Sequence, residues 1–160
     1  KDIFKKYHPR VVRFFLLSSH YRSPIEFSDQ LLEQSRSSLK SLDEIYLKNK
    51  DSGIDEELIS KVKEKLDNDF DVAGVFGVIF EWLNSKPMKI GGTLKKLNEL
   101  LNIFPVDFKI SQQQQILIEE REKARAEKNW SRSDEIRNQL AAEGVEIEDS
   151  KEGCFAKPRI

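Results

Sequence analysis

Apolar residues recur at steps of three and four along most of the chain, which is the spacing of one face of an α-helix. Pro9 suits the first turn of such a helix, and the pattern continues from there to His20. Ser28 is a candidate N-cap for a longer helix, whose narrow apolar stripe extends from Leu31 to Tyr46. The first part of the chain is therefore predicted to be helical.

Three further helices are predicted in the middle of the chain. Asp69 is placed to cap one of them, over residues 70–83. This helix is apolar on most sides, so we expect it at the centre of a helical bundle. Gly91 and Gly92 are predicted to lie in a loop before the last of the three, at residues 93–103.

Two polar helices are predicted next. Residues 112–129 are charged and favour a helix, but they carry only a thin apolar stripe. Ser131 or Ser133 can cap the following helix, at residues 134–143. Gly144 suits its C-terminal end, where the backbone turns into the left-handed conformation.

Apolar and acidic residues then alternate over residues 145–148, which is the spacing of a strand. A turn at residues 150–153 and the apolar residues from Cys154 onward predict a return strand. The predicted fold class is therefore mainly α, with a helical bundle at residues 1–110 and a small α+β subdomain at residues 111–160.

Composition narrows the class of protein. The chain has 160 residues, 38% of them apolar, and no apolar run approaches the ~20 residues that a membrane-spanning helix needs, so we expect no membrane association. Cys154 is the only cysteine, which excludes an internal disulfide and favours a reducing, cytoplasmic location. The chain begins with Lys1 and has no leader sequence, so we interpret it as a fragment, a processed chain or a partly ordered one.

The charge pattern leaves two explanations open. A net charge of -1 argues against a general nucleic-acid coat, because tight phosphate binding normally requires a basic excess. Residues 1–22 nevertheless carry six lysines and arginines against one acid, Asp2. A solvated helix face and an anionic partner explain this basic segment equally well.

Residues that would carry catalysis are few. Gly74 and Gly77 lie in an apolar helix, where close packing explains them better than a phosphate-binding loop does. His8 and His20 have no partner at metal-ligand spacing, and Cys154 has no nearby histidine to activate its thiol. The sequence therefore predicts no catalytic residue, metal site or cofactor in this chain.

Residues 121–137 contain the most specific local pattern. One helix ends near the lone Trp130, a second helix starts at once, and Gly144 then turns the chain into a short strand that ends in acids. This layout can gather one guanidinium, one indole and two carboxylates around a single concave corner. Such a set of side chains suits the recognition of unpaired bases.

Two segments resemble a known family. Residues 5–28 closely resemble the segment that follows the KMSKS loop in bacterial cysteinyl-tRNA synthetases. In that family an Asp-Ala-Leu-Arg motif opens a helical domain, and Arg10-Val-Val-Arg13 keeps only its final arginine. Residues 66–70 are similar to an acidic-Phe motif of the same domain, although the usual Asn-Thr-Pro does not follow them. The resemblance covers nearly the whole chain in order.

The resemblance implies the tRNA-binding C-terminal half of such an enzyme, a helical bundle of the Asp-Ala-Leu-Arg type with a small anticodon-reading unit. Arg125, Trp130, Asp134 and Asp149 fall where the family's anticodon-contacting residues lie. Stacking on Trp130 would contribute about 1–3 kcal/mol per base. Arg125 suits the acceptor pair of guanine, and the aspartates can accept from exocyclic amino groups. The expected GCA anticodon of cysteine tRNA offers both kinds of edge.

Basic residues near both ends are candidates for contacts with the tRNA backbone. These candidates are Arg10, Arg13, Arg22, Arg121, Arg132, Lys157 and Arg159. The family usually ends with a Thr-Trp-rich basic strand, whereas residues 154–159 stand there in this chain. Phe155 is a candidate replacement for the second aromatic residue of that strand.

Each proposed anticodon contact has a structural alternative. Trp130 can be a packing wedge between two helices, and Asp134 can stabilise the positive end of its helix. Arg125 can pair with Glu122 or Asn129, and Asp149 can be a turn residue. The resemblance favours the anticodon role for these four residues.

The resemblance also implies a parent enzyme that attaches cysteine to its tRNA through a cysteinyl-adenylate. Its ATP-Mg and zinc would be bound in an N-terminal catalytic domain, whose motifs and ligands are absent from these residues. We therefore expect a monomeric chain that binds cysteine tRNA, contacts its own catalytic domain and is inactive alone.

Two alternative functions remain open. A related ligase joins cysteine to an amino-sugar and keeps the helical bundle, but such enzymes lack the anticodon unit. A helical protein-interaction module would use the stripe from Leu31 to Tyr46 as its binding face.

Overall fold

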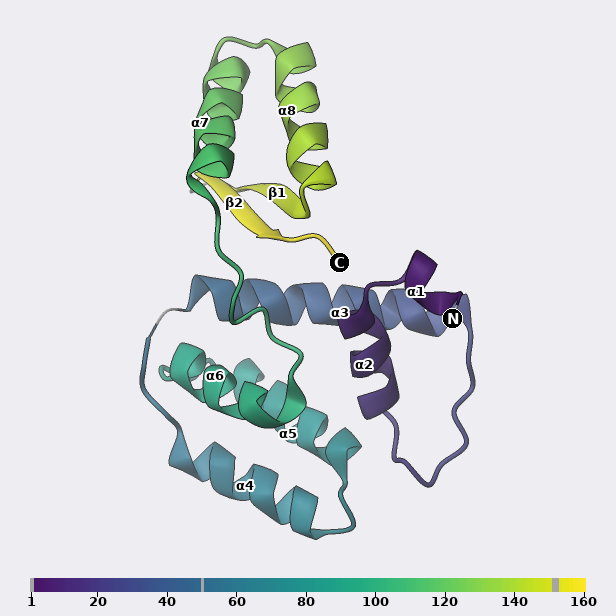
Figure 1. Ribbon diagram of the computed structural model, residues 1–160. Coiled ribbons are helices and arrows are strands. Elements are labelled where there is room, and N and C mark those ends of the chain that lie inside the picture. Colours follow the sequence, from purple (N-terminus) through teal and green to yellow (C-terminus); the bar gives the residue numbers. More distant parts are fainter. Residues whose placement is uncertain (1, 50, 151–152) are drawn as a thin grey trace. The chain divides into compact units, whose positions relative to one another are not determined.

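The computed structural model describes residues 2–49, 51–150 and 153–160 (Figure 1). The basic Lys1 and the predicted turn residues 151–152 lie outside this set. Within the described ranges, eight helices precede a two-stranded antiparallel sheet. The predicted fold class, mainly α with a small α+β part at the end, is therefore confirmed.

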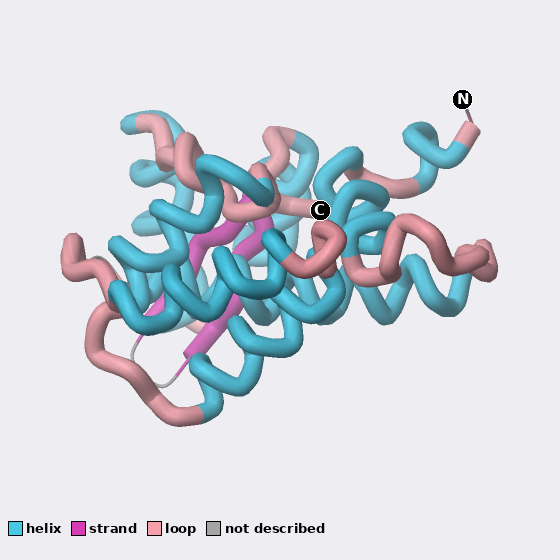
Figure 2. The backbone as a smooth tube through the Cα atoms, turned by 90° about the horizontal axis from the view of Figure 1, so that it is seen from below, coloured by secondary structure: helices cyan, strands magenta, loops and turns pink. Residues whose placement is uncertain are grey.

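The chain divides into two compact units, Lys1–Val106 with Ile160 and Asp107–Arg159. The helices of the first unit are α1 (Ile3–Lys6), α2 (Pro9–Leu17), α3 (Asp29–Lys48), α4 (Glu56–Asp67), α5 (Val72–Asn84) and α6 (Ile90–Leu101). Both α2 and α6 pack against α3, and α4 packs against α5. Figure 2 shows these helices, and the strands of the second unit, from another direction. The single turn α1 has no counterpart among the predicted helices.

Side-chain caps fix the starts of α3 and α4 in the first unit. The hydroxyl of Ser28 accepts a hydrogen bond from the Leu31 amide at 3.3 Å, which confirms the predicted N-cap of α3. Asp55 caps α4 in the same way, with the Leu58 amide 3.1 Å from its carboxylate.

The predicted cap of α5 is wrong. Asp71 is the N-cap, because its carboxylate accepts from the Gly74 amide at 2.8 Å. Asp69 and Phe70 instead adopt left-handed backbone conformations, with φ of 54° and 51°. The Asp69 carboxylate is turned toward Tyr21, whose hydroxyl donates to it at 2.6 Å. A long-range contact has therefore overridden the local capping preference of Asp69.

The core of the first unit is formed mainly by α2 to α6. Its buried members are Tyr7, Val11, Val12, Phe14, Phe15, Leu32, Leu39, Leu42, Leu58, Val62, Val75, Phe76, Ile79, Leu94, Leu97, Leu101, Ile103, Phe104 and Ile160. Val75 and Ile79 of α5 are fully buried, as its apolar pattern predicted. Phe14 and Phe76 pack edge to face with ring centroids 4.9 Å apart, which joins α2 to α5.

The predicted loop at Gly91 and Gly92 is wrong, because both glycines lie in the first turn of α6. The backbone that follows α3 passes close to them. A Cβ on Gly91 would lie 2.3 Å from the carbonyl oxygen of Asn49, and one on Gly92 would lie 2.4 Å from that of Gly53. Asp51 completes this junction by accepting from the Gly91 amide at 2.7 Å. These glycines are therefore required by close backbone approach rather than by a turn.

Gly91→Ala is expected to lower the free energy of unfolding of the first unit by about 1–3 kcal/mol, since the new methyl group must displace rigid backbone. Gly77→Ala is the matched control. Gly77 is exposed within α5, and a Cβ at this position would meet no atom within 4 Å beyond the backbone of its own helix. The close packing predicted for Gly77 is therefore wrong, and alanine should stabilise α5 by up to about 1 kcal/mol. Urea unfolding followed by circular dichroism compares the two, and equal effects would contradict this explanation.

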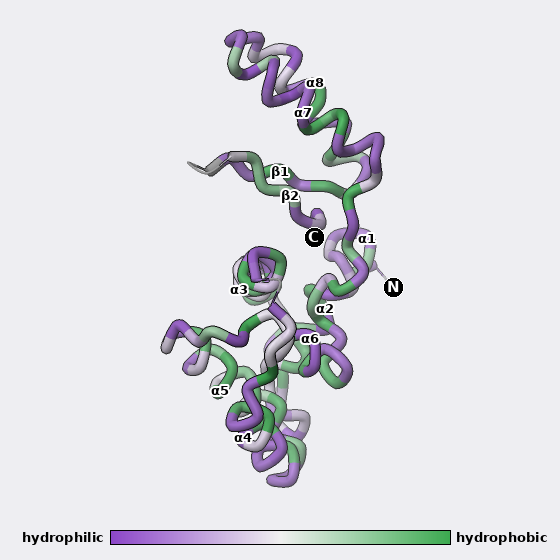
Figure 3. Tube along the Cα trace, turned by 90° about the vertical axis from the view of Figure 1, so that its left-hand side faces the viewer, coloured by the Kyte–Doolittle hydropathy of each residue, from purple (hydrophilic) through white to green (hydrophobic). Residues whose placement is uncertain are grey.

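The second unit contains α7 (Gln112–Ala126), α8 (Trp130–Ala142), β1 (Val145–Ser150) and β2 (Gly153–Pro158). The strands are antiparallel, with Val145 opposite Pro158 and Asp149 opposite Cys154, so the predicted hairpin is confirmed. The buried core of this unit consists of Leu117, Ile118, Ile136, Leu140, Val145 and Ile147. Figure 3 shows hydrophobic positions of α7, α8 and β1 in green among the polar faces of these elements.

The two helices of this unit are joined tightly. Ser111 and Gln114 form a capping box at the start of α7. Asn129 caps α8 by accepting from the Arg132 amide at 3.2 Å, so the predicted caps Ser131 and Ser133 are wrong and Ser133 is buried inside the helix. A left-handed Lys128 lets α8 start immediately after α7.

Gly144 follows α8 with φ of 82°, which confirms the predicted C-terminal glycine.

Candidate functional site

Trp130 is the first residue of α8 and lies at the junction with α7. Its side chain is 57% exposed, although an indole of this size is usually well buried. The exposure argues against a packing wedge between the helices. It leaves a flat aromatic surface open to a ligand.

Arg125 joins Trp130 to Asp149. The guanidinium carbon lies 5.9 Å from the centre of the indole ring, within the range of a cation–π contact. The Nη1 of Arg125 lies 3.1 Å from Oδ2 of Asp149. Arg125 and Trp130 at the junction of α7 and α8, and Asp149 on β1, thus form one group, which we call the Trp130 cluster. The predicted alternatives, a pairing of Arg125 with Glu122 or Asn129, are not present among the described residues.

Asp149 reaches this cluster because of the alternation of β1. Val145, Ile147 and Asp149 lie on the same face of the strand, and the first two are buried in the core against α7 and α8. Asp149 is therefore a strand residue held against α7, rather than a turn residue.

Arg121, also on α7, binds the carboxylate of Asp149. Its Nη1 and Nη2 donate to Oδ1 and Oδ2 of Asp149, each at 2.8 Å, in a bidentate pair. These bonds hold the pKa of the Asp149 carboxyl below its ordinary value, although partial burial opposes them. A lowered pKa means that this pair contributes to stability above the ordinary pKa of an aspartate, and that the contribution is lost as the pH falls through the lowered value.

Asp134 lies one turn after Trp130 on the same face of α8 and is exposed. It follows the first turn of the helix, so it does not stabilise the positive end of α8 in the way the alternative supposes. The described residues offer its carboxylate no hydrogen bond or ion pair. The structure therefore places Asp134 beside the Trp130 cluster, without a contact to it.

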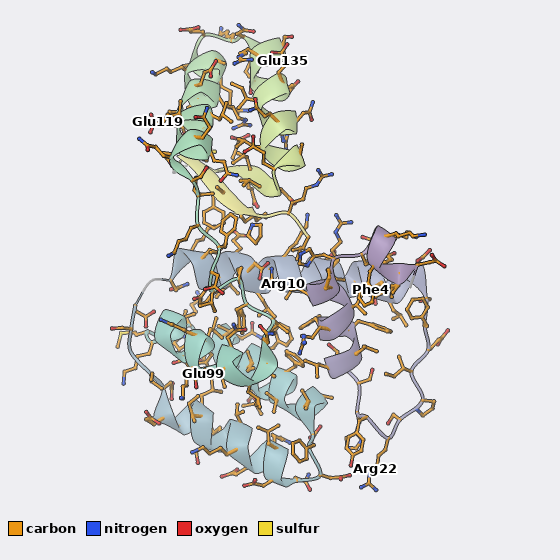
Figure 4. The ribbon with its side chains drawn as sticks, in the orientation of Figure 1. Phe4, Arg10, Arg22, Glu99, Glu119 and Glu135 are labelled. Atoms are coloured by element: carbon orange, nitrogen blue, oxygen red, sulfur yellow. The ribbon has the colours of Figure 1, made fainter. Side chains whose placement is uncertain are left out.

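Four of the predicted backbone-contacting residues present charge to solvent. Arg13 is exposed on α2, and Arg22, in the loop after α2 (Figure 4), pairs with Asp69 at 3.0 Å. Arg132 lies on α8 and pairs with two acids of its own unit. Arg159 is exposed after β2, and its guanidinium donates to a carbonyl at the end of α8.

The other three form hydrogen bonds and ion pairs within the protein. Arg10 extends from α2 toward α3 (Figure 4), where it bonds Asp43, and its Nε donates to the Ile103 carbonyl at 2.7 Å. Lys157 is 7% exposed and pairs with Glu148 across the hairpin. Arg121 has only 1% of its side chain exposed. The charges of Arg121 and Lys157 are buried and that of Arg10 is partly buried, so all three are held by contacts within the protein.

One neighbouring residue was not predicted from the sequence. Arg137 is exposed on α8, and its charge contributes to lowering the pKa of Asp149. It lies three residues after Asp134 and seven after Trp130, hence on the same face of the helix. This helical spacing was the available signal.

Metal-ligand clusters and membrane-spanning helices are absent from the described residues. No three side chains among His, Cys, Asp and Glu converge in a way that could hold a metal ion within that part of the chain. No helix among the described ranges is both long enough and apolar enough to cross a bilayer.

Comparisons with known proteins identify similar sequences for this chain. Residues 109–155 match the family described as the cysteinyl-tRNA ligase anticodon binding domain. Cysteine–tRNA ligases of three bacteria are similar to nearly the whole chain. The Legionella pneumophila protein is 31% identical over 95% of this chain, the Pseudomonas aeruginosa protein 34% over 96%, and the Streptococcus mutans protein 36% over 95%.

This chain covers 37%, 38% and 36% of those three relatives, so it spans a little more than a third of their length. The family match contains all three members of the Trp130 cluster, and Asp134 as well. The comparisons do not favour the amino-sugar ligase or the protein-interaction module. The chain belongs to the cysteinyl-tRNA ligase family, and residues 109–155 are the anticodon-binding domain of that family.

Proposed function

We propose that the second unit binds the anticodon of cysteine tRNA through the Trp130 cluster. The observation that supports this most strongly is the position of Arg125, which contacts both the indole and the Asp149 carboxylate. The guanidinium of Arg125, which can donate hydrogen bonds, therefore contacts both an indole that can stack a base and a carboxylate that can accept hydrogen bonds. Unstacked bases of an RNA loop are recognised by groups of this kind.

Each member of the cluster has a role that follows from its chemistry. The exposed face of Trp130 stacks one base, and this stacking does not depend on which base it is. Arg125 can donate two parallel hydrogen bonds to O6 and N7 of guanine. Asp149, held in the ionised form, accepts from the exocyclic amino group of cytosine or adenine. The GCA anticodon expected for cysteine contains one base for each of these contacts.

Exposed charged residues of both units are proposed as further contacts with the tRNA. Asp134 is the second acceptor, because its carboxylate is open on the same face of α8 as Trp130. Arg132 and Arg159 in this unit, and Arg13 and Arg22 in the first, are proposed to contact phosphates. Affinity should then fall steeply with salt concentration, since phosphate contacts release counterions.

The proposal extends to the whole protein. The full-length enzyme would attach cysteine to its tRNA through a cysteinyl-adenylate, with ATP-Mg and zinc bound in a catalytic domain that these residues do not include. Residues 1–110 would form the helical tRNA-binding domain and residues 111–160 the anticodon-reading subdomain. We propose cysteine tRNA and the catalytic domain as the partners of this chain, and a monomer as its state.

Filter binding tests the proposal. The chain should bind cysteine tRNA more tightly than the same tRNA with an exchanged anticodon, by about tenfold for each lost base contact. The exchanged tRNA is the matched control, because it keeps every phosphate. Equal affinity for the two tRNAs would contradict anticodon recognition, even if both bound tightly.

A further inference from the structure

Arg121 occupies a position that stability alone does not explain. It is the largest fully buried side chain of the described residues and carries a full charge. Its Nη1 and Nη2 bond Asp149, whereas its buried Nε finds no hydrogen-bond partner among the described residues. A buried ion pair of this kind can often be replaced by apolar residues without loss of stability. The free-energy cost of burying this charge indicates that Arg121 has a role in the Trp130 cluster.

We infer that Arg121 is a positioning residue, which holds Asp149 as a fixed acceptor that selects a base with an exocyclic amino group over its keto counterpart. This inference rests on the proposed anticodon contact of Asp149. It assigns to Arg121 a part in base specificity, in place of a contact with the tRNA backbone.

The bidentate geometry determines which acceptor sites remain. A carboxylate has about four acceptor sites, two on each oxygen. Arg121 uses one on each oxygen, and Arg125 lies 3.1 Å from Oδ2 as an ion pair. Oδ1 keeps an open site, and the Asp149 side chain is 36% exposed. An amino group can donate there, whereas a keto oxygen meets another oxygen.

The charges around Asp149 keep this acceptor ionised. Arg121 and Arg125 on α7 and Arg137 on α8 all lower its pKa, and the bonds from Arg121 have the largest effect. Cys154 on β2 also faces the pair, and burial raises the pKa of its thiol, so it adds no charge at neutral pH. Loss of Arg121 should therefore raise the pKa of Asp149. Without the two bonds from Arg121 the carboxylate is also free to turn away from the base, so the selection should weaken.

Binding of anticodon stem–loops by the whole chain tests this role. The probes are the GCA loop and two keto variants, with uracil for cytosine and hypoxanthine for adenine. In the unchanged chain the GCA loop should bind about tenfold more tightly than one keto variant, at both about pH 7.5 and about pH 5.5. Arg121→Met should reduce this ratio to about two at both pH values, because the carboxylate is no longer held toward the base while Arg125 and Arg137 still lower its pKa. Arg121→Lys keeps the charge without the fork, so it should retain part of the ratio at both.

A structural role alone would give a different pattern. If Arg121→Met weakens binding of all three loops by the same factor at both pH values, the inference is overturned and the proposed function stands. If the unchanged chain prefers no loop, the proposed function itself fails. Circular dichroism confirms that each variant is folded. Should Arg121→Met lose its helicity, Arg121→Lys decides, and an unchanged GCA-to-keto ratio in that variant overturns the inference.

Discussion

Trp130→Ala is expected to raise the Kd of the chain for the cysteine anticodon stem–loop by roughly 5- to 150-fold, because stacking on an aromatic face contributes about 1–3 kcal/mol per base. The indole is largely exposed, so its removal costs little packing in the free chain. Alanine also favours the helix that starts at this residue. The substitution should therefore lower affinity without changing the helical circular dichroism signal.

Trp82→Phe is the control for this variant. Trp82 lies on α5 in the first unit, and its Nε1 donates to the carboxylate of Asp55 at 2.9 Å. The phenylalanine loses this bond and keeps the aromatic packing. Thermal stability should fall slightly while Kd stays the same. Equal losses of affinity in the two variants, with helicity intact, would show that Trp130 has no special part in binding.

Ile136→Ala should unfold the second unit selectively and abolish loop binding. Ile136 is fully buried on α8 and belongs to a core of only six buried residues. Truncation of a buried isoleucine to alanine costs about 2–5 kcal/mol. A unit with so small a core has little stability beyond this amount. Two-dimensional NMR of the labelled chain should lose the dispersed amide signals of residues 107–159 and retain those of the first unit.

The matched substitution in the larger core is Leu39→Ala. Leu39 is fully buried on α3 within the core of the first unit. It should lower the unfolding midpoint of that unit, yet leave the signals of the second unit and its loop binding in place. Retained loop binding by Ile136→Ala with lost signals of the second unit would exclude that unit as the binding site.

Periodicity and capping chemistry predicted most of the fold. The helix after Ser28 and the hairpin after Gly144 follow from local patterns, and both are present. The errors lie where distant segments meet. Asp69 does not cap α5 because it bonds Tyr21. Gly91 lies in α6 rather than in a loop, and a glycine is needed there because the backbone after α3 lies against it. A local pattern does not contain such contacts.

The candidate site divides in the same way. Arg125, Trp130 and Asp149 were predicted together, and the structure brings them into one cluster. Arg121 is buried because Asp149 of β1 lies against it. The sequence alone does not reveal this burial, because Arg121 cannot be told there from an exposed arginine. Asp134 was predicted as a fourth member. It lies on the same face of α8 as Trp130 but does not contact the cluster.

The central claim is that an anticodon base stacks on Trp130, and tryptophan fluorescence tests it most directly. In the Trp82→Phe chain, Trp130 is the only remaining tryptophan. Titration with the GCA stem–loop should quench its emission, with the same midpoint as filter binding. A loop that lacks the three anticodon bases but keeps every phosphate should leave the emission unchanged. Saturable binding of the GCA loop without quenching, or equal quenching by the loop without bases, would contradict the claim.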